Sequence, residues 1–430
     1  MIKTILKDSF VYGILNAVNK FFTFIVFFIY VSFLSKETIA VLDMIIVFSF
    51  ILSIFISMQL ESSFARFYFN RKENNEQFDL LKTIVYMMFA FVFLYLVPAY
   101  IVFELLFANY DIDSYSFIFP VLVLSAFLVN ITNLVNLHFR YSYERKNFIL
   151  SSCLYPVTYL IVIAVYIFLN GSMNMFVVFT SQLVGLLLVL FFQYIVVGKQ
   201  IINSRFQTKY IKEIFRYSLP MLPMFFLIFA NDKAIIYILR EFITLDILAD
   251  FSVATRLLAF LSLLFFALRM ALEPKVNHFM SYPNDDSKSE FKQYINIYIF
   301  FSIALFGIFT LIIPYIQLQF FPNFVNAAKW SVVLAISLIL LNMGTYMTPG
   351  FGIKKRMDIK LLIVLAQVVF NFVGFYFVLK NGHSIVLALK YIVFINYVFL
   401  LVQHYYSNKL YKVSNEYLKA TALFSLVFIV

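Results

Sequence analysis

Long runs of apolar residues alternate along this chain with short polar breaks. A run of about 18 or more apolar residues is long enough to cross the hydrocarbon core of a bilayer as a helix. The pattern predicts roughly twelve such helices, each covering about 30 Å at about 1.5 Å per residue. They are expected near residues 9–34, 39–60, 80–107, 114–137, 148–170, 173–197, 216–240, 247–271, 293–316, 327–348, 358–379 and 384–405.

The composition supports the same class of protein. Apolar residues make up 63% of the 430 residues, whereas charged residues make up only 13%. A soluble domain of this length needs more polar surface to cover its core. The sequence therefore predicts an all-α polytopic membrane protein. The final apolar stretch, residues 417–430, reaches about two-thirds of the length of a span, so it either lies at the interface or begins a thirteenth helix.

Positive charge gathers in every second break between the expected helices. The odd-numbered breaks hold only Lys36, Arg240, Lys329 and Lys380, while the even-numbered breaks and both ends hold most of the other Lys and Arg residues. Because Lys and Arg are retained on the cytoplasmic side, both ends of the twelve-span core are predicted to be cytoplasmic. This topology explains the net charge of +11 without a nucleic-acid partner, and anionic lipids of the inner leaflet are the expected neighbours of these loops.

The topology repeats in the two halves of the chain. Six spans in each half give two parallel bundles related by an axis along the membrane normal, an architecture found in alternating-access transporters. The expected organisation is a first bundle over 1–198, a cytoplasmic linker over 199–215, a second bundle over 216–406 and a tail over 407–430.

Several charged residues fall inside the expected spans. Such residues cost about 2.5–3.5 kcal/mol on insertion scales and usually face a cavity or a partner. Lys20 and Arg256 lie deep in the first and eighth spans, with no acidic residue one turn away on the same helix. They predict a hydrated, cationic cavity that attracts an anionic ligand. Asp232 and Lys233 interrupt the seventh span, where they either serve the same cavity or neutralise each other.

Uncharged polar residues and two further acids complete the candidate sites. Asn130, Asn133 and Asn136 recur at intervals of three in the fourth span, which places them on one slowly drifting helix face. This stripe either bonds a neighbouring helix or lines a wet cavity. Asp43 and Asp250 lie one turn inside the second and eighth spans, where they are either interfacial residues or acids that couple an ion.

The features that are absent from the sequence exclude several function classes. No break between spans exceeds about 25 residues, which leaves no room for a soluble catalytic domain. There is no phosphate-binding loop of the type that hydrolyses ATP. The single cysteine, Cys153, cannot form an intramolecular disulfide, and no Cys/His cluster has metal-ligand spacing. No metal or other cofactor is expected.

A proline-containing motif, Ser218-Leu219-Pro220-Met221-Leu222-Pro223, is followed by Asn231-Asp232-Lys233. This pattern resembles the "SLPLLP…DR" signature of the lipid-linked oligosaccharide flippases. That family belongs to the polysaccharide-transporter branch of the multidrug/oligosaccharidyl-lipid/polysaccharide exporter superfamily, and the resemblance extends along nearly the whole chain. Other matching segments are Ser9–Gly13, Glu61–Tyr68, Leu248–Leu257 and Gly352–Lys355. Lys233 stands where the family usually has Arg, so the charge is kept but the planar, two-pronged grip on phosphate is lost.

The resemblance implies two six-helix lobes that form a V-shaped cavity. It also implies a substrate, an undecaprenyl-diphosphate-linked oligosaccharide, carried from the inner to the outer leaflet of a bacterial cytoplasmic membrane, with polysaccharide polymerase machinery as a further partner. We expect Lys20, Arg66, Lys233 and Arg256 to attract the diphosphate. The sugars would bind the Asn130 and Asn133 stripe, and a proton or sodium ion would couple through Asp43, Asp232 or Asp250.

Other functions remain open from the sequence alone. Within the same superfamily, the alternatives are a multidrug or metabolite antiporter and a flippase for the peptidoglycan precursor lipid II. The alternative from another class is a membrane-embedded O-antigen polymerase or glycosyltransferase. Such enzymes carry a long outward loop with catalytic Arg or acidic residues, whereas the longest outward break here, residues 317–326, contains no charge. We therefore expect a transporter and not an enzyme.

Overall fold

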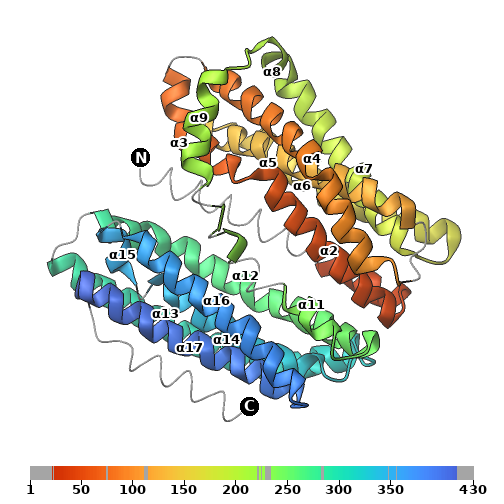
Figure 1. Cartoon of the computed structure of the whole chain (residues 1–430), viewed down its shortest axis with the longest axis vertical. Coiled ribbons are helices and arrows are strands. Elements are labelled where there is room, and N and C mark those ends of the chain that lie inside the picture. Colours follow the sequence, from red (N-terminus) through yellow and green to blue (C-terminus); the bar gives the residue numbers. More distant parts are fainter. Residues whose placement is uncertain are drawn as a thin grey trace. The chain divides into compact units, whose positions relative to one another are not determined.

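The computed structural model describes residues 22, 24–73, 76–110, 115–219, 222–223, 225–227, 234–281, 285–346, 348–354 and 356–413. These residues form helices and connecting turns, with no strand among them. Within this part of the chain, 10 helices are long and apolar enough to cross a membrane (Figure 1). The prediction of an all-α polytopic membrane protein is confirmed. The described residues leave out 9–21 and 23 of the expected first span, 220–221, 224 and 228–233 of the expected seventh span, and the whole stretch 417–430.

The chain divides into two compact units, which are described separately. The first lies within Leu15–Phe226. Its labelled elements are α2 (Lys36–Ser57), α3 (Leu60–Glu73), α4 (Gln77–Phe107), α5 (Tyr115–Tyr141), α6 (Arg145–Asn170), α7 (Met175–Gln193), the π-helix η1 (Tyr194–Gly198), α8 (Lys199–Asn203) and α9 (Thr208–Ser218).

Local sequence signals explain where several of these helices begin and end. Ser35 precedes α2 and its side chain accepts a hydrogen bond from the backbone N–H of Thr38, which satisfies one of the free donors of the first turn. Asn174 caps α7 in the same way through Val177. Gly171 ends α6 with φ 67°, a left-handed conformation that glycine adopts without a Cβ clash.

Packing in the first unit pairs α6 with α7, α5 with α7, and α2 with α4 and α5. Aromatic side chains fill the contact between α2 and α4, where the ring of Phe48 lies 5.5 Å from Phe103 and 6.1 Å from Phe107. Phe103 and Phe107 are fully buried, as the contact of two tightly packed spans requires. Elsewhere the outer face of α4 carries exposed apolar side chains, which suits a helix surrounded by lipid.

The second unit contains the described chain from Leu227 onward. Its elements are α11 (Ile235–Arg240), α12 (Leu245–Ser281), α13 (Asp285–Phe320), α14 (Ala327–Tyr346), α15 (Pro349–Ile353), α16 (Met357–Lys380) and α17 (Ile385–Leu410). The α14 helix packs against α12, α13 and α17, and α16 packs against α17. In the most apolar part of the span Ala327–Ile353, which contains α14, 73% of the residues are buried, whereas the corresponding share for α16 is 28%. The α14 helix is therefore the central helix of this unit.

Residues 199–215, which the sequence predicts to be a linker, contain α8 and most of α9. Both helices pack within the first unit, α9 against α3 and α4, and α8 against α4 (Figure 1). The buried face of α9 carries Tyr210, Ile214 and Ser218, which recur every four residues. This helical period places them on one side of α9, so the segment is an amphipathic helix fixed to the first bundle.

Candidate functional site

The charged residues predicted to bind ligand differ in where the structure places them. Lys20, Asp232 and Lys233 lie outside the described residues. Arg66 is exposed on α3, outside the membrane-spanning helices. Arg256 lies on the membrane-spanning helix α12 and is half-buried. It lies near the centre of the membrane-spanning stretch Leu245–Phe265, which also contains the buried Asp250.

The asparagine stripe of α5 splits between buried and exposed positions. Asn130 is buried and bonds α2: its Nδ2 donates to the carbonyl of Ser53 at 3.0 Å, and its Oδ1 accepts from the Ser53 hydroxyl at 3.1 Å. Asn133, by contrast, is exposed. Asn130 therefore joins two helices, whereas the amide of Asn133 is accessible on the surface of the unit.

A glutamine on α7 holds three helices together, α5, α6 and α7. The Nε2 atom of Gln193 lies within bonding distance of the Thr132 carbonyl (3.0 Å), the Asn136 amide oxygen (3.2 Å) and the Ser151 hydroxyl (2.9 Å). Gln193 directly precedes the π-helix η1, a local widening of the helix that often accompanies a functional or packing requirement. Asn136 thus serves helix packing.

We expect the variant Gln193→Ala to lower the free energy of unfolding of the detergent-solubilised protein by about 1–3 kcal/mol, because buried acceptors on α5 and α6 lose their donor. Thermal unfolding monitored by circular dichroism measures the change. Gln200→Ala is the control, since Gln200 is exposed on α8 and its substitution should stay within about 0.5 kcal/mol. Equal unfolding temperatures for the two variants would contradict the assignment.

The two candidate ion-coupling acids that the structure describes are both buried. Asp43 lies on α2 and Asp250 on α12. The Oδ2 atom of Asp250 accepts hydrogen bonds from the backbone N–H of Asn326 at 3.1 Å and from its side-chain amide at 2.8 Å. Asn326 precedes the first turn of α14, so Asp250 places a negative charge at a helix N-terminus, where it is stabilised. The Oδ1 atom of Asp250 is buried and accepts no hydrogen bond from the described residues.

A hydrogen-bond network fastens the segment after α8 to the start of α4. Asp79 accepts from the backbone N–H of Arg205 at 2.7 Å and from the Gln207 amide at 3.2 Å. Lys82 donates to the carbonyls of Ile202 and Ser204, both at 2.8 Å. These carbonyls belong to the last turn of α8 and to Ser204, the residue that caps its C-terminal end, where oxygens lack intrahelical donors and a cation is favourable.

A second set of contacts fastens α9 to α3. Arg71 pairs with Glu213 at 2.6 Å and with Glu76 at 3.4 Å, and its guanidinium lies 4.3 Å from the centroid of the Tyr210 ring. The Tyr210 hydroxyl donates to Glu76 at 2.5 Å, which, with the nearby cations Lys209 and Arg71, holds the pKa of the Glu76 carboxyl below its usual value. We call the contacts of Arg71, Glu76, Asp79 and Lys82 with residues 202–213 the clamp.

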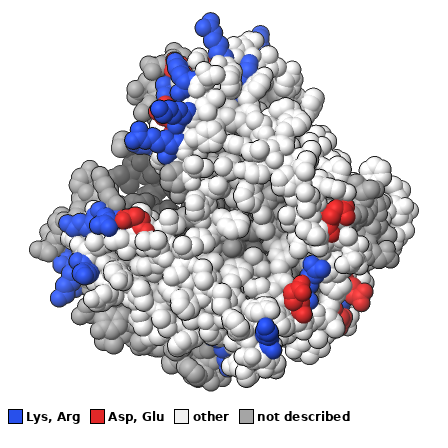
Figure 2. All heavy atoms as spheres, in the orientation of Figure 1, with Lys and Arg blue, Asp and Glu red and all other residues white. Residues whose placement is uncertain are grey.

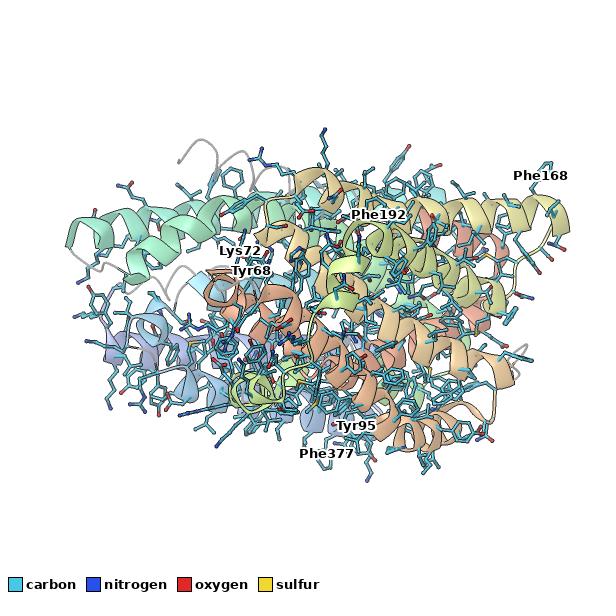
Figure 3. The ribbon with its side chains drawn as sticks, turned by 90° about the horizontal axis from the view of Figure 1, so that it is seen from above. Tyr68, Lys72, Tyr95, Phe168, Phe192 and Phe377 are labelled. Atoms are coloured by element: carbon cyan, nitrogen blue, oxygen red, sulfur yellow. The ribbon has the colours of Figure 1, made fainter. Side chains whose placement is uncertain are left out.

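The opposite face of α3 packs against the end of α5. The Lys72 ammonium lies 5.8 Å from the centroid of the Tyr68 ring, and both residues are labelled in Figure 3. The Tyr68 hydroxyl lies 3.4 Å from Nδ1 of His138. Burial, with a contribution from nearby Glu144, raises the pKa of Tyr68 to about 12, so the phenol stays neutral and able to donate.

The helix break between α2 and α3 is the most unusual backbone feature of the first unit. Met58 has φ 45° and Gln59 has φ 58°, a left-handed pair of non-glycine residues. Each such residue is held at a cost of about 1–3 kcal/mol by its surroundings, and such positions often occur at functional sites. Tyr95, which Figure 3 labels, donates to the Met58 sulfur at 3.6 Å. Burial raises the pKa of Glu61, two residues after the break, to about 7.

The pKa of Glu61 predicts a pH-dependent stability. The folded protein keeps this proton up to about pH 7, whereas the unfolded chain releases it near the ordinary value of 4.5. The contribution of protonated Glu61 to the free energy of unfolding is therefore fully present below about pH 4.5, and it is lost as the pH rises from there through about 7. Glu61→Gln should remove about 1–2 kcal/mol of this loss between about pH 5 and pH 8, measured by thermal unfolding. The exposed residue Glu37 provides a control, since Glu37→Gln should leave the profile unchanged.

The second unit contains a buried polar network that the sequence analysis did not identify. Oδ1 of Asn396 on α17 accepts from Gln367 at 2.8 Å and from Asn371 at 2.9 Å, both on α16. Its Nδ2 donates to Ser337 on α14 at 2.6 Å, and Gln403 donates to Gln367 at 3.2 Å. The spacing of these polar residues could have predicted the network. Gln367 and Asn371 are four residues apart and Asn396 and Gln403 are seven apart, so each pair lies on one helix face.

Comparisons with known proteins match this chain to one family and to membrane transporters with the same fold. A family profile described as "Polysaccharide biosynthesis protein" matches residues 5–280. An inward-facing multidrug resistance MATE family transporter of the MOP superfamily aligns with TM-score 0.68 and 15% identity, covering 96% of this chain and 95% of that chain. A eukaryotic MATE transporter aligns with TM-score 0.65 and 15% identity over 99% of both chains. A MOP superfamily transporter from Pyrococcus furiosus aligns with TM-score 0.60 and 16% identity, covering 98% and 96%. No curated protein matches the sequence. The shared fold is therefore that of multi-pass membrane transporters.

Proposed function

Because the chain belongs to the polysaccharide biosynthesis protein family, we propose that it is a flippase for an undecaprenyl-diphosphate-linked oligosaccharide. It carries this lipid from the cytoplasmic to the outer leaflet of a bacterial cytoplasmic membrane by alternating access, without catalysing a reaction. Both ends of its twelve-span core are cytoplasmic, and polysaccharide polymerase machinery receives the product.

The half-buried Arg256 within the membrane-spanning helix α12 is the observation that carries this proposal. Charged side chains at membrane depth usually face a hydrated cavity or a partner, and the planar fork of a guanidinium matches phosphate oxygens. A sugar diphosphate is bulky, polar and anionic, so it requires a wide hydrated cavity containing cations. Its polyprenyl chain remains in the lipid.

Other residues have distinct roles in this proposal. Arg66, Lys20 and Lys233 add positive charge for the diphosphate. Asn133, whose side chain is exposed, contacts the sugars. Asn130 has less freedom to do so, because both ends of its amide already bond backbone or side-chain groups of α2 and α5.

Acidic residues couple transport to a cation gradient. Asp250 is suited to this role because its buried Oδ1 has no hydrogen-bond donor among the described residues and can bind a proton or a sodium ion. Asp43 and Asp232 are the other candidates. Imposing a proton gradient and then a sodium gradient across vesicles that contain the protein tells which of the two ions is coupled to transport.

The direct test uses the purified chain in vesicles that contain fluorescent undecaprenyl-diphosphate-linked oligosaccharide. A membrane-impermeant reductant reports how much lipid faces outward. We expect translocation that depends on the protein and on a cation gradient. A rate equal to that of protein-free vesicles under every gradient would overturn the proposal.

A multidrug or metabolite antiporter is the second candidate, since solved structures with the same fold include MATE transporters. Such an antiporter would move organic cations out of gradient-loaded vesicles. We expect no such efflux, because a cavity containing Arg256 repels cations. Efflux of an organic cation without lipid translocation would favour the antiporter.

A further inference from the structure

We propose that the segment 199–219 is a binding surface for anionic phospholipid headgroups, held in a fixed position by the clamp. The surface consists of α8, α9 and the residues between them, all within the first unit. Its role differs from that of the transport cavity, and it stands whether or not the transported substrate is a lipid-linked sugar.

The first argument is the charge of the segment. Exposed cations lie along it at Lys199, Arg205, Lys209, Lys212 and Arg216. Figure 2 shows Lys and Arg atoms gathered over the region of α3, α8 and α9. The one acidic residue of the segment, Glu213, pairs with Arg71 at 2.6 Å. The segment therefore presents a strong positive charge, which attracts anionic headgroups.

The second argument is the position of exposed apolar side chains beside these cations. Ile202 is 57% exposed, Phe206 43%, Tyr217 36% and Leu219 51%. Apolar side chains in contact with water alone would add no stability, whereas lipid acyl chains would cover them. Lys and Arg mixed with aromatic and aliphatic side chains are typical of helices at the boundary between headgroups and acyl chains.

The third argument is depth. The membrane-spanning stretch Met175–Asn203 includes α8, so the cations of α9 follow immediately after a span. Phosphates of the headgroup layer lie at this level. The long side chains of Lys and Arg reach them while their apolar stems stay against the protein.

The clamp makes the surface a defined site instead of a flexible charged loop. Asp79 and Lys82 hold residues 202–207, while Arg71 and Glu76 hold Tyr210 and Glu213. The carboxylates near the surface are thus occupied by protein donors. The headgroup would meet a surface whose backbone is already ordered, which lowers the entropy lost on binding.

The test places the full-length protein in phosphatidylcholine nanodiscs that contain a trace of photoreactive phosphatidylglycerol. After illumination, digestion and mass spectrometry locate the label. We expect label in peptides from residues 199–219 and its displacement by unlabelled phosphatidylglycerol but not by phosphatidylcholine or by inorganic diphosphate.

The variant Lys212→Gln/Arg216→Gln should reduce this labelling roughly 25-fold, because each cation near an anionic surface contributes roughly fivefold. Neither residue belongs to the clamp, so the fold should survive, which an unchanged unfolding temperature verifies. The variant Lys329→Gln/Lys380→Gln removes the same number of exposed charges from the second unit and should have no effect.

Three results would overturn the proposal. The first is equal labelling by phosphatidylcholine and phosphatidylglycerol analogues. The second is unchanged labelling of the Lys212→Gln/Arg216→Gln variant. The third is displacement by inorganic diphosphate but not by phosphatidylglycerol, which would assign the surface to a soluble or substrate diphosphate group instead of a lipid of the bilayer.

Discussion

Replacing Arg256 with Ala should reduce lipid translocation by about 10- to 100-fold while the protein remains in the membrane. In the proposed function Arg256 forms a charge-assisted hydrogen bond to the diphosphate, and the loss of such a bond is worth about 1.5–3 kcal/mol. The effect should be large because Arg256 lies near the centre of the membrane-spanning stretch Leu245–Phe265. Translocation in vesicles, normalised to the amount of reconstituted protein, measures it.

Two companion variants separate charge from geometry. Arg256→Lys keeps the charge but loses the two-pronged fork, so it should retain an intermediate rate. Lys380→Ala removes an exposed cation at the end of α16 and should translocate at the wild-type rate. If Arg256→Ala also translocates at the wild-type rate, Arg256 does not contact the substrate.

The variant Gly350→Ala should destabilise the second unit by about 2–4 kcal/mol. A Cβ atom at position 350 would lie 2.1 Å from the backbone carbonyl oxygen of Ser407, and backbone cannot rotate away as a side chain can. The movement would also break the hydrogen bond from the Gly350 N–H to the Ser407 hydroxyl at 2.9 Å. This bond joins the short helix α15 to α17, so both helices should loosen together. Thermal unfolding in detergent measures the loss.

Gly307→Ala provides the matched control for this substitution. Gly307 lies within α13, and among the described residues no atom outside the adjacent backbone of its own helix lies within 4 Å of the position that a Cβ would occupy. Alanine has a higher helix propensity than glycine by about 1 kcal/mol, so this variant should be as stable as the wild type or slightly more stable. Equal destabilisation by both variants would mean that the close approach of α15 to α17 is not the cause.

The sequence predicts the membrane-spanning helices well because the residues of each segment alone determine whether that segment forms a span. The expected spans 80–107 and 384–405 correspond to α4 (Gln77–Phe107) and α17 (Ile385–Leu410). The hydrophobicity and length of a segment are properties of that segment alone, and they determine whether it can enter a bilayer. The residues that precede the spans, such as Ser35 and Asn174, supply the caps that fix their starts.

The role of each polar residue was much harder to predict. Asn130 and Asn133 share a stripe in sequence, yet one bonds α2 inside the bundle and the other is exposed. The sequence predicts Asp250 as a candidate ion-coupling acid. In the structure Asp250 also accepts two hydrogen bonds from Asn326 at the start of α14. Three helix positions of about 100° each leave the two side chains about 60° apart around the helix axis, which is enough to exchange a protein partner for an exposed surface.

By itself, the sequence determined that this is a polytopic helical membrane protein and where most of its spans lie, because burial of apolar segments in lipid depends on local composition. Only the tertiary structure decided that α9 is clamped to α3 and α4, that Gly350 must lack a side chain, and that Asn396 joins three helices. These features depend on how neighbouring helices are rotated and how closely they approach. Contacts between residues far apart in the chain set both quantities.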